Sequence, residues 1–121
     1  MSAPLQTGVD NQAEHVVTEE MTPRHLLPAV VLSTPKMIEL MEQCCLEAVE
    51  ARLEDGETTV GTHVNVSHEA AALGGETVSV RCRLTDIDRR RLTFEVSATV
   101  EDRVIGEGVH ERFVVDRSRY G

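Results

Sequence analysis

Two segments in the second half of the chain alternate apolar and polar residues with a period of two. In TVSVRCRL (77–84) every second side chain is apolar, and LTFEVSATV (92–100) repeats the pattern. Such alternation is typical of antiparallel strands that bury one face. The polar segments that follow them, 86–91 and 101–103, have the length of hairpin connections. The chain is therefore predicted to form an antiparallel sheet whose apolar face needs a second layer.

A single long helix is predicted to supply that layer. The segment LSTPKMIELMEQCC (32–45) offers Thr34 as N-cap and Pro35 at the first helical position. Asp55 and Gly56 are expected to stop the helix, after about Leu53.

Three further strands complete the expected sheet. A first strand is predicted over 13–21, and two more over the segments TTVGTHVNVSHEAA and VIGEGVHERFVV. In the former, Val60, Val64 and Val66 are expected to share one face. The predicted order is one strand, the helix and four strands, an α+β architecture in which a five-stranded antiparallel sheet wraps around one long helix.

The length of 121 residues predicts one domain. Residues 1–11 are polar and lack periodicity, so they are expected to form a flexible N-terminal arm, with a single domain over 12–121.

The charge of the chain excludes some partners. A formal net charge of -9 argues against nucleic acid and against an anionic membrane surface.

The chain has neither a signal-peptide pattern nor an apolar run of the ~20 residues that span a bilayer. Its three cysteines lack zinc-ligand spacing and are expected to be buried, reduced thiols. These features predict a cytoplasmic protein with no metal and no redox cofactor.

Glu42 is the unusual residue of the predicted helix. A helical wheel places most of its acidic residues on one exposed face, but Glu42 falls between Val49 and Leu53, on the face expected to be buried. A buried carboxylate must be hydrogen-bonded, paired, protonated or open to a cleft. Acids of this kind are frequent in active sites. A dimer interface or a pairing arginine would explain Glu42 equally well.

Three other residues each allow a functional and a structural explanation. His68 ends its strand on the inward face, where it would meet the helix or serve as a core histidine bonded to backbone. Thr34 could cap the helix or stand in a site at its positive end. Arg112 could bind a ligand or be a surface arginine. His63, His68 and His110 lack a spacing that defines a metal site.

Taken together, Thr34, Glu42, Gly61, His68 and Arg112 resemble the fluoroacetyl-CoA thioesterase family of hotdog-fold proteins. The resemblance lies in STPKMIELMEQCC, VGTHVNVSHEAA and GEGVHER and covers roughly residues 13–116. It implies a hotdog fold, a catalytic triad of Thr34, Glu42 and His68, and substrate contacts from Gly61 and Arg112. It also implies a homodimer, or a higher homo-oligomer, with the site between subunits.

The resemblance implies hydrolysis of an acyl-CoA thioester to a free acid and CoA. One segment departs from the family, because HLLPAVVL (25–32) stands where the fluoroacetate-specific enzyme has a longer lid with phenylalanine. Specific gating for fluoroacetyl-CoA is therefore not expected. Three alternatives remain: a non-catalytic acyl-CoA binding module, a hydratase or dehydratase on the same fold, and a purely structural dimer domain.

Overall fold

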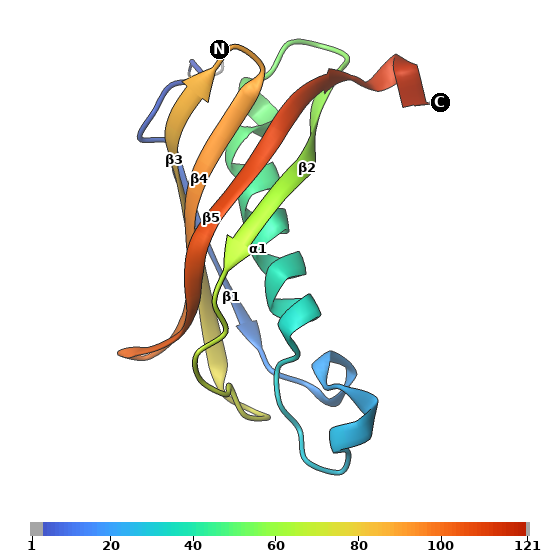
Figure 1. Cartoon of the computed structure of the whole chain (residues 1–121), viewed down its shortest axis with the longest axis vertical. Helices are drawn as coiled ribbons and strands as arrows, with labels where there is room; N and C mark the ends of the chain where they lie inside the picture. The colour runs from blue at the N-terminus through green and yellow to red at the C-terminus, as the bar shows by residue number, and fades with distance from the viewer. Residues whose placement is uncertain (1–3, 121) are drawn as a thin grey trace.

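The computed structural model describes residues 4–120, which form five strands and one long helix (Figure 1). In chain order the main elements are β1 (Asp10–Val16), α1 (Thr34–Val49), β2 (Glu57–Val66), β3 (Thr77–Asp88), β4 (Arg91–Val100) and β5 (Arg103–Asp116). Short 3-10 turns lie at Glu19–Met21, Arg24–Leu26, Glu50–Arg52 and Arg117–Tyr120.

The strands form one antiparallel sheet in the order β1-β3-β4-β5-β2. The sheet curves, and α1 lies along its concave side (Figure 1). The predicted architecture, a five-stranded antiparallel sheet wrapped around one long helix, is confirmed. By the order of the strands, β1 and β2 are the two edges of the sheet.

The core confirms the alternation predicted for β3 and β4. From Val78 to Leu84 and from Leu92 to Val100 every second residue is buried, and these side chains pack against one face of α1. The strands contribute Val78, Val80, Cys82, Leu84, Leu92, Phe94, Val96, Ala98 and Val100, and the helix contributes Met37, Leu40, Met41, Cys44, Cys45 and Val49. The other sheet face carries polar side chains.

The first strand differs from its prediction. It spans Asp10–Val16 rather than 13–21, and Glu19–Met21 is a 3-10 turn. The sheet therefore begins within the segment expected to be a flexible arm. Asn11 also binds the helix, because its side-chain amide donates to the Cys44 carbonyl at 3.1 Å. β1 forms its backbone hydrogen bonds with β3 although it contains few apolar residues. Hydropathy alone therefore does not predict where this strand begins.

A β-bulge corrects the predicted face of β2. The register with β5 shifts between Gly61 and His63, which leaves Thr62 without a pairing partner. The extra residue reverses the alternation. Val60 therefore does not share a face with Val64 and Val66 as expected, because Thr59 and Gly61 take the inward positions before the bulge.

The helix begins one residue earlier than predicted. Ser33 is the N-cap, and its hydroxyl accepts from the Lys36 amide at 3.1 Å. Thr34 is the first helical residue, so its hydroxyl is not needed as a cap. The α-helix ends at Val49 and continues as the 3-10 turn Glu50–Arg52.

The three cysteines are free and buried, as predicted. The sulfur atoms of Cys44 and Cys82 are 3.6 Å apart, which is a thiol contact rather than a disulfide. Contact with the Cys82 thiol and burial raise the pKa of Cys44 far above its ordinary value, so this thiol is unreactive. Within residues 4–120, no helix has the length and apolar character required to cross a membrane.

The cap assignment can be tested by stability. Ser33→Ala should lower the free energy of unfolding by about 1 kcal/mol, because it leaves a first-turn amide without its acceptor. Thr34→Ala is the matched control and should change stability less, because its hydroxyl does not cap the helix. Urea unfolding of both variants measures the difference. An equal or larger loss in Thr34→Ala would contradict the assignment.

Candidate active site

Thr34 and His68 are joined by a short hydrogen bond at the start of α1. The distance from Thr34 Oγ1 to His68 Nδ1 is 2.6 Å. Thr34 is exposed and His68 is half-buried. The pair lies beside the positive end of the helix dipole, which favours developing negative charge. A hydroxyl held against an imidazole can lose its proton to that ring.

Backbone hydrogen bonds fix both partners of this pair. On the Thr34 side, Leu32 N donates to Ala72 O at 2.9 Å and Ser33 N donates to Met21 O at 2.8 Å. On the His68 side, the flanking amides of Ser67 and Glu69 donate to β5 carbonyls at 2.9 and 2.6 Å. The two residues, distant in sequence, are thereby held at one place.

A hollow of about 360 Å³ opens beside the pair. Thr34 and His68 form part of its wall. Most of the remaining wall is apolar and comes from two loops, through Pro23, Leu26, Val31, Leu32, Ala70 and Ala71. A small apolar group next to the hydroxyl would fit this hollow.

Glu42 lies farther along the helix and is less buried than predicted. Its side chain is 40% exposed, because it faces the edge strand β2, beyond which no further strand covers the helix. Its Oε1 is 3.6 Å from Arg112 Nη1 and 3.9 Å from His110 Nε2. The carboxylate is thus paired, as the physical argument required, and also open to solvent.

Arg112 points inward rather than toward solvent. Its side chain is only 8% exposed. The Nε atom donates to Thr59 Oγ1 at 2.7 Å and Nη2 donates to the Thr59 carbonyl at 3.0 Å. Burial lowers the pKa of Arg112, and the charge of Glu42 opposes this effect. The simple surface explanation for Arg112 is therefore wrong, while substrate binding stays a prediction.

Gly61 is opposite Arg112 in the sheet and leaves room for the carboxylate. A methyl group added at Gly61 would come within 2.5 Å of Glu42 Oε1 and 3.2 Å of the His110 ring. Any side chain at Gly61 would therefore push the end of Glu42 away from its partners. This is the close backbone approach that the glycine of VGTHV allows.

The predicted site residues form two groups in a single chain. Glu42 lies eight positions after Thr34 in the α-helix, a rise of about 12 Å. Across residues 4–120, no ion pair or hydrogen bond joins Glu42 to His68. The expected contact between Glu42 and His68 is thus not made within the chain. Thr34 and His68 form one group, and Glu42, Gly61 and Arg112 form the other.

His110 belongs to the second group and was not among the predicted catalytic or binding residues. Its ring is 1% exposed, with Nδ1 2.8 Å from the His63 carbonyl and Nε2 3.2 Å from Arg112 Nη1. Burial and the Arg112 charge lower the pKa of His110, against the His63 carbonyl bond and Glu42, which raise it. The available signal was its position two residues before Arg112, on the same face of a strand. No metal-binding group of three or more side chains occurs in the described part of the chain.

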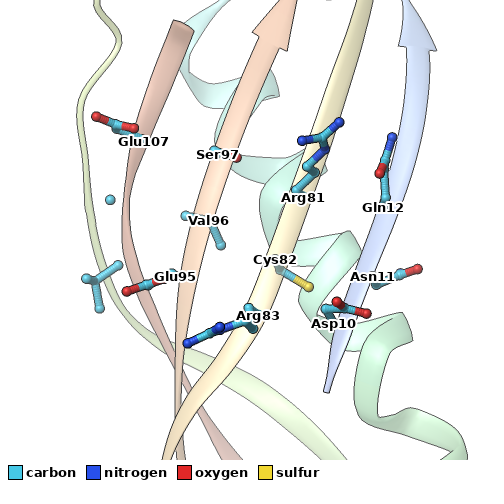
Figure 2. Close-up of a pocket in the computed structure, with 12 residues that line it drawn as sticks. Asp10, Asn11, Gln12, Arg81, Cys82, Arg83, Glu95, Val96, Ser97 and Glu107 are labelled. Carbon is cyan, nitrogen blue, oxygen red and sulfur yellow. The ribbon is translucent and has the colours of Figure 1, made fainter. Parts of the chain in front are cut away.

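A separate open groove of about 820 Å³ lies on the outer face of the sheet. Figure 2 shows its polar side chains on β1, β3 and β4, with α1 behind the strands. Arg81 and Arg83 stand among the acids Asp10, Glu95 and Glu107. None of the predicted site residues lines this groove.

Comparisons with known proteins identify the family of the chain. The family model described as "Fluoroacetyl-CoA-specific thioesterase" matches residues 12–118. A fluoroacetyl-CoA thioesterase of Streptantibioticus cattleyicolor is 37% identical over 128 residues, which cover 99% of this chain and 92% of that protein.

Solved structures show the same fold. The fluoroacetyl-CoA thioesterase FlK superposes with a TM-score of 0.89 at 35% identity, covering 98% of this chain and 93% of FlK. A phenylalanine-to-alanine variant of FlK in complex with fluoroacetate and CoA gives 0.88, also at 35% identity, over 97% of this chain and all of that one (100%). A thioesterase superfamily member of Thermus thermophilus gives 0.87 at 31% identity, over 98% of this chain and 89% of that one. The fold is thus the hotdog fold, and the chain belongs to the fluoroacetyl-CoA-specific thioesterase family.

Proposed function

We propose that this protein is an acyl-CoA thioesterase that hydrolyses its substrate to a free acid and CoA. The observation that carries the proposal is the 2.6 Å hydrogen bond between Thr34 Oγ1 and His68 Nδ1 beside an apolar hollow. The relatives add that a member of this family acts on a CoA thioester. The chain's own residues supply the groups that the reaction needs, with no metal or redox cofactor.

The proposed chemistry begins at Thr34. His68 Nδ1 accepts the hydroxyl proton while Oγ1 attacks the thioester carbonyl, which forms a C–O bond. The positive end of the helix dipole stabilises the oxyanion. The C–S bond then breaks, and the CoA sulfur leaves with a proton from His68. Water hydrolyses the acyl ester, with Glu42 and His68 as the acid–base pair.

The separation of the two groups supports a site shared between two subunits. Thr34 and His68 of one chain cannot reach Glu42 of the same chain through the contacts described, because about 12 Å of helix lies between them. We propose that each active site combines Thr34 and His68 of one subunit with Glu42 of a second copy. Gly61 and Arg112 would accompany Glu42 and contact the bound acyl-CoA.

The edge strand β2 is the surface proposed for this homodimer. From Thr58 to Val66 it carries no Asp, Glu, Lys or Arg, and its Val64 is 42% exposed. Unprotected, uncharged edges pair readily with another strand. The opposite edge, β1, has Asp10 and Glu14 and is protected by their charges.

The lining of the hollow guides the choice of acyl group. Leu26 and Val31 provide apolar walls, and the 25–32 segment contains no phenylalanine. We therefore propose a small apolar acyl group without specific selection for fluoroacetyl-CoA. The three buried free thiols also support the predicted cytoplasmic location.

The first test measures CoA release from a panel of acyl-CoAs, from acetyl and fluoroacetyl to medium-chain and aromatic. Glu42→Gln keeps the size of the side chain but removes the base, so kcat should fall on the order of 100-fold or more. Glu47→Gln, on the exposed face of the same helix, is the control and should match wild type. Equal rates in Glu42→Gln would make Glu42 structural. Ligand binding without any CoA release would favour the binding module.

The second test asks whether the site is shared. Thr34→Ala and Glu42→Gln should each be inactive, but a heterodimer of the two contains one site with native Thr34, His68 and Glu42. Coexpression with different affinity tags should restore about half of the wild-type rate per heterodimer, because one of two sites is intact. A heterodimer as inactive as its parents would show that each chain supplies its whole site.

The third test concerns the dimer surface. Val64→Lys puts a charge on the β2 edge and should give a monomer by light scattering. Val16→Lys makes the same change on the β1 edge, where Val16 is 53% exposed, and should leave the dimer intact. A Val64→Lys protein that remains dimeric would refute pairing through β2.

A further inference from the structure

His110 is fully buried, yet nothing in the proposed chemistry uses it. Its ring lies between β2 and α1, with Arg112 beside it on β5. A buried histidine needs a hydrogen-bond partner for each ring nitrogen, whereas an apolar residue would fill a core position without this requirement. The partners of the ring indicate what it does.

The two ring bonds define the tautomer of His110. The His63 carbonyl oxygen can only accept, so Nδ1, at 2.8 Å, must carry the hydrogen. Arg112 can only donate, so Nε2, at 3.2 Å from Nη1, must be the acceptor. Both bonds are satisfied together only by a neutral ring. A protonated ring would turn an N–H toward the guanidinium and add a second positive charge there.

Two residues hold the Arg112 guanidinium by hydrogen bonds, Thr59 on one side and His110 on the other. Thr59 receives the Nε and Nη2 hydrogens, which anchors one edge of the guanidinium. His110 receives a hydrogen from Nη1, the nitrogen that lies 3.6 Å from Glu42 Oε1. Throughout residues 4–120, Glu42 is the only carboxylate within 4.0 Å of Arg112. The orientation of Nη1 therefore depends on His110, and the position of Glu42 depends on Nη1.

Glu42 needs this support because the rest of its surroundings are open. Its side chain is 40% exposed and has three rotatable bonds, and Gly61 limits it on one side only. An unanchored glutamate would sample several rotamers, and a misplaced catalytic group loses much of its effect.

We propose that His110 is a positioning residue, which fixes the Arg112 guanidinium so that Arg112 holds the Glu42 carboxylate in its working place. The inference rests on the proposed role of Glu42 as part of the acid–base pair. His110 itself touches no substrate and transfers no proton. The lowered pKa of His110 agrees with a ring that stays neutral at pH 7, with Arg112, Glu42 and His63 as the titratable or charged residues around it.

Two variants separate the positioning role from simple packing. Gln at position 110 can place an amide oxygen where Nε2 was and still accept from Arg112. Asn reaches only as far as Nδ1, so it can donate to the His63 carbonyl but leaves Nη1 without an acceptor. His110→Gln should keep kcat within about 3-fold of wild type, whereas His110→Asn should lose on the order of 10-fold or more in kcat with little change in KM.

The control is His15→Asn on β1, at the opposite edge of the sheet, which should leave kcat and KM unchanged. The free energy of unfolding is measured for every variant. A fall in kcat that follows stability equally in the Gln and Asn variants would overturn the proposal, and so would wild-type kcat in His110→Asn.

A second readout does not depend on activity. Nitrogen-15 NMR of the wild-type histidines should show His110 as a neutral ring with its hydrogen on Nδ1 at pH 7. A hydrogen on Nε2, or a charged ring, would overturn the proposal even if the variants fail to fold. If wild type hydrolyses no acyl-CoA, the proposed function fails, while the NMR result still decides whether His110 accepts from Arg112.

Discussion

The packing of α1 against the concave face of the sheet is the constraint on which the site depends. The helix buries a continuous row of side chains, from Met37 to Val49, against β3 and β4, so it can neither slide nor turn. This fixes Thr34 at one end of the helix and Glu42 two turns further on. The distance between the hydroxyl and the carboxylate is thus a property of the core rather than of the loops.

The β2 bulge matters because it decides which groups face the helix beside Glu42. A regular strand would keep one alternation from Thr59 onward, and Val64 and Val66 would then point outward. The extra residue at Thr62 gives both valines inward positions, while Gly61, which precedes the bulge, stays opposite Arg112. The irregularity therefore determines that the end of β2, which is followed by His68, faces the helix.

The sequence predicts the regular elements well and the irregular ones poorly. The alternation in β3 and β4 and the long helix follow from hydropathy, because burial alone determines them. Hydropathy does not reveal the bulge or the start of β1, because these depend on pairing with distant strands. It also does not distinguish Ser33 from Thr34 as the cap, because both residue types cap helices. Glu42 was correctly identified as unusual, yet its half-exposed position follows from β2 being an edge strand. His110 gave only a weak signal, because a histidine in a strand is compatible with many roles.

The half-exposed state of Glu42 has a physical advantage if, as proposed, the site is assembled from two copies. A fully buried carboxylate would destabilise the single chain unless it were completely paired. Here water solvates Glu42 on one side, while the buried Arg112 is already bonded to Thr59 on the other. When a second copy covers the edge, the carboxylate would lose water but keep an arginine that needs no rearrangement. Preorganised charge of this kind is most effective in a site from which water is excluded. In the proposed dimer, the desolvation of Glu42 would thus occur at assembly, after the fold of each chain is complete.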